Sequence, residues 1–254
     1  MSVVLSLVAR KGGVGKTSTA LNLAGAALDD GATDVVLIDM DSQASLSKAL
    51  LGASHVESLR ADETVQAVAE RTKSAGDVAC ETQIEGLRIV PAFNDLRVPI
   101  DAALHLGGID PDIIIIDTPP DVRDQSVRCA LLASNVVISP VVPEGWGLQS
   151  CHSVQQLLMS AGLLSNQELF FAGWLPNMVQ RVAIHSLCMD TLHRMYGGNV
   201  FTNALPQATA FKEAAANGVP VTHNKAKNKA AKCVRAVYEE LINRISAHYE
   251  REAA

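Results

Sequence analysis

Aromatic residues and long apolar runs are scarce in this sequence. Phe, Tyr and Trp make up 4% of its 254 residues, whereas Ala, Val, Leu and Ile are plentiful. This composition favours helices packed on a parallel sheet over an all-β sandwich. The chain has no run of about 18 or more apolar residues, so we expect no transmembrane helix. A hydrophobic fraction of 48% suffices for a well-buried core and argues against a disordered chain.

The sequence also lacks paired cysteines and an excess of positive charge. Its five cysteines are an odd number, are widely spaced and form no C-x-x-C pair, which indicates reduced thiols in a cytoplasm. They are Cys80, Cys129, Cys151, Cys188 and Cys233. The net charge of −6 excludes a protein that is cationic everywhere, so any nucleic-acid surface must be a local patch. The opening "MSVVLSLVA" has no basic residue and no cleavage site, and we interpret it as a buried strand rather than a signal peptide.

Short β-branched runs alternate with longer helical patterns along the whole chain. The runs predict strands at 3–9, 34–40, 86–93, 112–120, 135–143, 169–177 and 199–206. Helices are expected near 15–29, 43–51, 62–73, 122–133, 147–161, 182–196, 208–217 and 226–249. The alternation predicts a single α/β domain over residues 1–254, with a mostly parallel, twisted sheet and helices on both of its faces.

Polar residues follow five of the expected strands. These residues are Arg10 and Lys11, Asp39 and Asp41, Asp117 and Thr118, Pro143 and Glu144, and Asn177. In an open α/β sheet, ligands bind at the carboxyl ends of the strands. We therefore expect these side chains to meet in one crevice.

The segment "RKGGVGKT" at 10–17 predicts a phosphate-binding loop. An ordinary loop of this kind reads G-x-x-x-x-G-K-[ST], and Arg10 stands here in place of its first glycine. The three glycines leave backbone N–H groups free for phosphate oxygens, Lys16 offers a charge, and Thr17 offers a hydroxyl to Mg²⁺. An apolar strand precedes the loop and a helix follows it, as in a P-loop NTPase. The expected nucleotide contacts are Lys11, Gly12, Gly13, Val14, Gly15, Lys16, Thr17 and Ser18.

Two segments are expected to bring carboxylates to this loop. The run "IIIID" ends in Asp117, which predicts a Walker B acid that holds Mg²⁺ through water, the alternative being an Asp that caps a turn. The segment "LIDMDSQ" carries Asp39 and Asp41 two residues apart, which places both on one side of an extended backbone. One of them can hold the water ligands of the metal and the other can orient an attacking water. For either one, capping the following helix is an open alternative.

The motifs "RKGGVGKT", "VVLIDMDSQ" and "IIIIDTPP", in this order, resemble those of the ParA/MinD group of deviant-Walker (SIMIBI) ATPases. Within that group the chain is most similar to the small, Soj-like ParA partition ATPases that have no N-terminal DNA-binding extension. The resemblance continues through "VVISPVVPEGWGLQS" and "FTNALPQATAFKEAAANGVPV", so it covers nearly the whole chain.

The resemblance implies a role for each residue that matches a family motif. Lys11 matches the lysine that reaches across an ATP-sandwich dimer to the phosphates of the other subunit. Lys16 and Thr17 would hold phosphate and Mg²⁺, with Asp117 as the Walker B acid and Asp39 beside it at the metal. Asp41 falls on the acid that positions the hydrolytic water.

The resemblance also implies where the base lies, and this sequence departs from the family at two positions. Asn177 and Pro206 match residues that line the base. The segment "NKAK" at 224–227 is not the NKxD motif that reads guanine, which favours ATP over GTP. The family commonly has Pro where this chain has Ser42, and Gln or a small residue where it has Arg10, so the sequence leaves open the stiffness of the switch loop and the hydrolysis rate.

A run of basic residues without an acid lies ahead of the last helix. It comprises Lys225, Lys227, Lys229, Lys232 and Arg235. Lys212, Arg181 and Arg194 would add to it if they share its face. The run is interpreted either as a solvated helix start or as a DNA-binding surface, and the family, whose ATP-bound dimers bind DNA without sequence preference, favours the latter. No aromatic residue interrupts the lysines, so contacts to the duplex backbone are expected rather than base stacking.

The resemblance predicts an ATP-driven positioning switch. ATP and Mg²⁺ close a homodimer, the dimer binds nonspecific double-stranded DNA of the nucleoid, and a ParB-like or other cargo adaptor stimulates hydrolysis. The cargo is a plasmid, a chromosome or a protein microcompartment. A MinD-like division-site regulator on the membrane is an alternative, but the helix at 226–249 carries glutamates and lacks a basic, bulky tail, so packing on the domain is favoured. A relative of the nitrogenase iron protein is disfavoured because neither Cys80 nor Cys129 lies in a glycine-rich ligand context.

Overall fold

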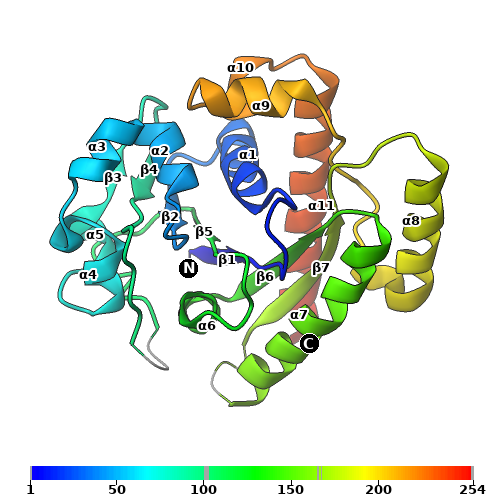
Figure 1. Cartoon of the computed structure of the whole chain (residues 1–254), viewed down its shortest axis with the longest axis horizontal. Coiled ribbons are helices and arrows are strands. Elements are labelled where there is room, and N and C mark those ends of the chain that lie inside the picture. Colours follow the sequence, from blue (N-terminus) through cyan, green and yellow to red (C-terminus); the bar gives the residue numbers. More distant parts are fainter. Residues whose placement is uncertain (1, 100–102, 165, 167, 253–254) are drawn as a thin grey trace.

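A seven-stranded sheet with strand order β3-β4-β2-β5-β1-β6-β7 forms the centre of the protein (Figure 1). The computed structural model describes residues 2–99, 103–164, 166 and 168–252. The strands are β1 (Val3–Leu7), β2 (Val35–Asp39), β3 (Cys80–Glu81), β4 (Leu87–Val90), β5 (Ile113–Asp117), β6 (Val136–Val141) and β7 (Phe170–Pro176). Every pairing is parallel except that of β3 with β4. The predicted mostly parallel α/β sheet is confirmed, and the short antiparallel edge strand β3 was not expected.

The register of the central strands brings their acidic ends together. Asp117 of β5 pairs with Leu7 of β1 on one side and with Asp39 of β2 on the other. Parallel strands in this register end at one edge of the sheet, where loops can present side chains to a ligand.

Helices cover both faces of the sheet, as predicted. They are α1 (Lys16–Asp29), α2 (Ser45–Leu51), α3 (Ala53–Ser58), α4 (Val65–Ala69), α5 (Ala75–Val78), α6 (Gln125–Ala133), α7 (Gly145–Leu164), α8 (Ala183–Tyr196), α9 (Thr209–Ala216), α10 (Val221–Asn224) and α11 (Lys229–Glu252), with 3-10 turns η1 (Ala61–Glu63) and η2 (Gly197–Asn199). Successive residues of a strand point to opposite faces. In β5, Ile113 and Ile115 pack with α1 and α11, and Ile114 and Ile116 pack with α4, α5 and α6.

The last helix, α11, packs its apolar side into the core. Val234, Val237, Leu241 and Ile245 share a buried cluster with α1 and the strands. Figure 1 shows α11 running alongside α1 on one face of the sheet. Its burial occupies the apolar side that a membrane anchor would need. Within the described residues, no helix is both long and apolar enough to span a membrane.

Two expected elements are absent or broken. The segment 199–206, predicted as a strand, makes only isolated bridges, from Val200 to Trp174 and from Pro206 to Val179. A proline has no N–H for a ladder, and two glycines at 197–198 turn the chain just before this segment. The helix expected at 62–73 is split, because Thr64 caps α4 and the backbone leaves the helical region at Arg71, whose φ is 60°.

Candidate active site

The loop at 10–15 joins β1 to α1 and depends on two glycines. Gly13 and Gly15 have φ angles of 76° and 87°, a region that favours glycine. A Cβ atom at Gly15 would also collide with the side-chain amide of Asn177. The carbonyl of Gly15 accepts the first helical hydrogen bond, from the N–H of Thr19 at 2.8 Å. The first turn of α1 therefore points its unpaired backbone N–H groups at the loop, which makes an anion site.

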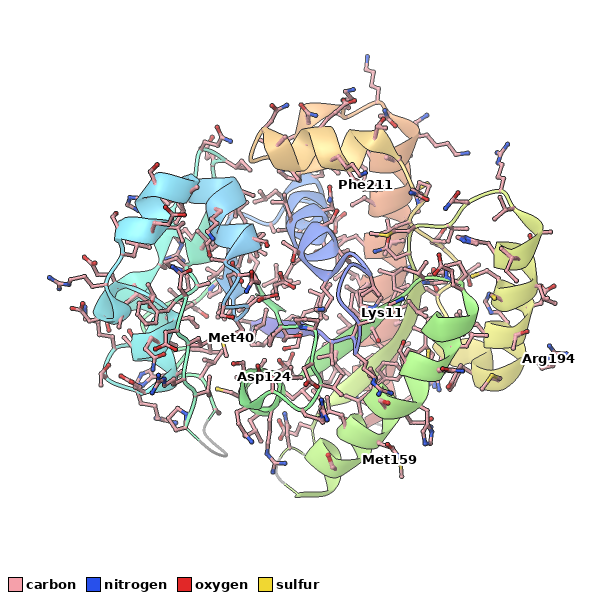
Figure 2. The ribbon with its side chains drawn as sticks, in the orientation of Figure 1. Lys11, Met40, Asp124, Met159, Arg194 and Phe211 are labelled. Atoms are coloured by element: carbon pink, nitrogen blue, oxygen red, sulfur yellow. The ribbon has the colours of Figure 1, made fainter. Side chains whose placement is uncertain are left out.

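The two lysines of this loop lie in opposite environments. Lys16 begins α1 and is buried; burial lowers its pKa, while the negative charges of Asp117 and Asp41 oppose that shift. Lys11 is exposed and makes no ion pair with the described residues. Figure 2 shows Lys11 on the loop before α1, on the side of α7. Lys16 thus lies close to the acids of its own site, whereas Lys11 is exposed to solvent.

Arg10, whose role the sequence left open, bonds within the chain. Its Nη1 donates to the Oγ of Ser153 on α7 at 2.7 Å. Its charge also helps lower the pKa of Asp121, to which hydrogen bonds from Arg123 contribute more. Arg10 therefore ties the segment that carries Lys11 to helix α7. The two residues are 143 positions apart in sequence, so no local pattern could reveal the contact.

Asp117 presents a buried carboxylate with no hydrogen-bond partner. The residue is 1% exposed, and neither carboxylate oxygen has a partner among the described residues. The Thr17 side chain lies near enough to act on the pKa of Asp117, which it lowers, but the two groups do not meet hydrogen-bond geometry. Burial first, and the charge of Asp39 second, raise the pKa of Asp117 to about 8. An unpaired buried carboxylate is costly, and a cation is the partner that would offset the cost.

Asp39, in contrast, has both oxygens occupied. Oδ1 accepts from the N–H of Asp41 at 3.1 Å, and Oδ2 accepts from the N–H and the hydroxyl of Ser47 at 2.9 and 2.7 Å. Burial raises the pKa of Asp39 to about 6, against these hydrogen bonds. The residue before α2, Ala44, has no side-chain acceptor, and Asp39 accepts one N–H group of that first turn, the N–H of Ser47.

Asp41 is the more accessible of the two acids. It is partly exposed, and its Oδ1 accepts only the N–H of Gln43, at 3.0 Å. Its own N–H is held by Asp39. The Asp41 carboxylate is thus partly accessible, on a backbone that the carboxylate of Asp39 holds. Ser47, which takes part in that anchoring, was not among the predicted site residues.

Of the two residues predicted to line the base, Asn177 contacts the loop, and Pro206 is bridged to the chain just after Asn177. The Nδ2 of Asn177 donates to the carbonyl of Val14 at 2.8 Å, and its Oδ1 accepts the N–H of Met178. Pro206 forms a bridge with Val179, two residues after Asn177. Asn177 therefore already supports the phosphate loop, and a base contact stays a prediction for both residues.

The donor set fits a magnesium ion held partly by a ligand. No cluster of three or more His, Cys, Asp or Glu among the described residues would form a metal cage. Mg²⁺ is usually held by one or two protein oxygens, with phosphate and water supplying the rest. Asp117, with its two unpaired oxygens, and the hydroxyl of Thr17 match that pattern. Both carboxylate oxygens of Asp39 already accept hydrogen bonds from the protein.

The basic run splits into paired and unpaired cations. Lys225 forms an ion pair with Glu213 of α9, and Arg235 forms one with Asp29 at 2.6 Å. Lys227, Lys229 and Lys232 are exposed and make no ion pair within the described part of the chain. Arg181 and Lys212 are exposed on other elements. Figure 2 shows Arg194 on α8, apart from helix α9.

The five cysteines are free thiols in the structure. Burial raises the pKa of Cys129 and of Cys151 to about 12, which keeps both thiols protonated and unreactive.

Several known proteins are similar to this chain in sequence or in fold. A family model described as the CobQ/CobB/MinD/ParA nucleotide binding domain matches residues 5–221. The sporulation initiation inhibitor protein Soj of Bacillus subtilis is 26% identical over 265 aligned positions, covering 98% of this chain and all of Soj.

Two solved structures share the fold. A putative plasmid partition protein from Borrelia burgdorferi, bound to AMPPNP, has a TM-score of 0.78 and 19% identity, covering 98% of this chain and 100% of its own. The cobyrinic acid a,c-diamide synthase from Mycobacterium smegmatis, with a bound ATP analogue and magnesium, has a TM-score of 0.81 and 23% identity, covering 95% and 94%. These likenesses confirm the predicted P-loop NTPase-like fold.

Proposed function

Because the chain belongs to the CobQ/CobB/MinD/ParA nucleotide-binding domain family, we propose that it is a ParA-like ATPase that positions cargo by an ATP-dependent cycle of dimerisation and DNA binding. One observation carries the proposal. The same loop holds a buried lysine, Lys16, close to its own acids and an exposed lysine, Lys11, that makes no ion pair with the described residues. A single nucleotide site needs the buried Lys16. The exposed Lys11 would find its partner in a phosphate group bound by a second subunit.

The nucleotide binds at the loop between β1 and α1. Backbone N–H groups at 12–18 surround the phosphates, and Lys16 supplies a charge to them. Thr17 and Asp117 would hold Mg²⁺, and Asp39 would hold a water ligand of the metal. The metal supplies charge stabilisation to the phosphates when it is bound. The ATP-analogue and magnesium complexes among proteins of this fold support ATP and Mg²⁺ as the ligands.

Hydrolysis depends on Asp41. Its accessible carboxylate orients the attacking water, while the engaged carboxylate of Asp39 fixes the backbone beneath it. Phosphoryl transfer needs little beyond positioning and charge stabilisation, so one well-held acid suffices. Hydrolysis is slow until an adaptor protein stimulates it.

The homodimer forms when two ATP-loaded sites face each other. Two buried triphosphates concentrate negative charge, and Lys11 from each chain offsets the charge of the other nucleotide. A stable dimer then requires ATP, because ADP lacks the terminal phosphate that Lys11 contacts. ATP shifts the population only if it binds the dimer better than the monomer, and this lysine provides that difference.

DNA binding by the dimer uses the exposed lysines at the start of α11. Lys227, Lys229 and Lys232 are free to contact phosphates, whereas Lys225 and Arg235 must first leave their ion pairs. Arg181 and Lys212 add contacts if the same face of the dimer reaches the duplex. Binding of this kind reads no sequence and places the protein on the nucleoid, in the cytoplasm. A ParB-like protein, or the adaptor of a microcompartment, then recruits the dimer to its cargo.

A sedimentation assay with nonspecific duplex DNA and anionic vesicles side by side tests this function. With Mg-ATP we expect the protein to pellet with DNA and not with vesicles, and neither ADP nor the absence of nucleotide should support binding. Three lysines from each subunit of the dimer give about six phosphate contacts, which predict a log–log salt slope of roughly −5.

The matched variants separate the paired from the unpaired cations. Replacing Lys227, Lys229 and Lys232 by alanine should remove most of the salt-dependent binding, and Lys225→Ala should remove much less. ATP-dependent binding to vesicles instead of DNA would favour a MinD-like function.

A further inference from the structure

The switch loop rests on a chain of hydrogen bonds that passes through one buried serine. The hydroxyl of Ser47 donates to Oδ2 of Asp39 at 2.7 Å and accepts from the N–H of Ala92 at 2.9 Å. The N–H of Ser47 donates to the same carboxylate oxygen. The other oxygen of Asp39 accepts from the N–H of Asp41. Three segments that are far apart in sequence thus meet at Ser47.

The direction of these bonds is fixed by chemistry. The N–H of Ala92 can only donate, so it occupies a lone pair of the Ser47 oxygen. The single hydroxyl proton of Ser47 is then committed to the Asp39 carboxylate. Both Ser47 and Asp39 are fully buried, so no water replaces a missing partner. A charge-assisted bond in such a place is among the stronger ones.

The arrangement links the sheet to the acid that orients the water. Ala92 follows β4, Ser47 lies in the first turn of α2, and Asp41 follows β2. Ala44 at the start of α2 has a φ of 54°, a strained value for alanine. The loop at 41–44 therefore needs an outside anchor, and Asp39 with Ser47 provides it.

We propose that Ser47 is a positioning residue that holds the Asp41 carboxylate in place through Asp39. This inference rests on the proposed role of Asp41 in hydrolysis. Ser47 itself touches neither nucleotide nor water. Its loss lets the loop at 41–44 sample other conformations, which lowers the rate of the chemical step and leaves phosphate binding by the 10–17 loop intact.

The test is Ser47→Ala, measured by steady-state ATP hydrolysis and by amide exchange without nucleotide. We expect kcat to fall about tenfold, as for loss of one charge-assisted hydrogen bond, with KM changed less than about threefold. The N–H groups of Asp41 and Ser47 should exchange faster, because both donate to Asp39. Ser47→Thr, which keeps the hydroxyl, should restore most of both. Ser45→Ala, on the exposed side of the same turn, is the matched control and should change neither.

Two outcomes overturn the proposal. One is an unchanged kcat in Ser47→Ala together with faster exchange, which would make the bond structural only. The other is an equal loss in Ser47→Ala and Ser47→Thr, which would point to packing. Asp41→Ala, run beside them, tests the proposed function separately: if it hydrolyses ATP normally, the role of Asp41 fails, and amide exchange alone then decides whether Ser47 holds the loop.

Discussion

Two charged groups, the half-buried Arg244 on α11 and the buried Asp117 at the end of β5, differ in how far the fold supplies them with partners. Arg244 donates to the carbonyls of Ala172, Gly198 and Val200 and pairs with Glu240 at 2.8 Å. Its guanidinium also lies 4.3 Å from the ring centroid of Phe201. Asp117 is more deeply buried and has no hydrogen-bond partner within the described residues.

The difference separates a charge that the fold has fully paired from one that is available to a ligand. Arg244 donates to a carbonyl of β7 and to carbonyls within and just after η2. Its N–H groups are therefore occupied by the protein rather than available to a ligand. Glu240, its partner, accepts the N–H groups of Thr202 and Asn203 at 2.8 Å each. Asp117 keeps its oxygens free at the edge of the sheet where Lys16 and Thr17 also lie. An unpaired buried carboxylate carries a cost that either a proton or a bound cation relieves.

Lys16→Ala should give the largest effect, because it removes the positive charge that is proposed to bind the phosphates. We expect ATP affinity to fall about a thousandfold, as when one member of a buried charge pair is lost. Fluorescent-nucleotide titration measures this, and the melting temperature without nucleotide serves as the folding control. Retained tight binding would show that the loop is not the phosphate site.

Arg244→Ala should have its effect on stability instead. We expect the free energy of unfolding to fall by about 3 kcal/mol, since Glu240 and three carbonyls lose their partner. Urea unfolding measures the change, and Arg251→Ala, exposed on the same helix, should stay near wild type. ATP affinity of the folded variant should be unaltered; a parallel loss of affinity would erase the distinction between the two regions.

Asp117→Asn should stabilise the nucleotide-free protein and weaken its response to Mg-ATP. The pKa values of Asp117, about 8, and Asp39, about 6, lie above their ordinary value, so the folded state binds more protons than the unfolded state between about pH 4 and 8. Stability from these groups is therefore present at low pH and is lost as pH rises through that window.

Melting curves at several pH values without nucleotide check this sign. Asp117→Asn removes the larger part of the decline and should be more stable than wild type by on the order of 2 kcal/mol at pH 8. Parallel pH curves for the two proteins would mean that the Asp117 carboxylate has a partner in solution.

Local sequence patterns predicted the parts of the candidate site that are contiguous in sequence. They could not predict contacts between residues that are far apart in sequence. The loop at 10–17, the "IIIID" strand and the "LIDMD" segment each combine an apolar run with polar residues at its end, so they could be placed from sequence alone. The bonds from Arg10 to Ser153 and from Asn177 to Val14 join residues 143 and 163 positions apart. Ser47 had one weak signal, a hydroxyl in the first turn of a helix that lacks a capping side chain.

The strand predicted at 199–206 was wrong for a related reason. Its apolar residues are buried, as the pattern indicates, but they pack as an irregular segment whose N–H groups bond to Glu240 and to carbonyls of β7. Burial alone does not distinguish a strand from a well-anchored loop. Arg244, which anchors this segment, comes from a helix more than 40 positions later.

The proposal that Lys11 acts across a dimer is tested most directly by sedimentation velocity in Mg-ATP. Asp41→Ala serves as the background, because stalled hydrolysis keeps the nucleotide as ATP. We predict a dimer for Asp41→Ala and a monomer for Lys11→Ala/Asp41→Ala, with ATP affinities for the monomer within about threefold of each other. A dimer of equal stability without Lys11, or a monomer that no longer binds ATP, would contradict the account.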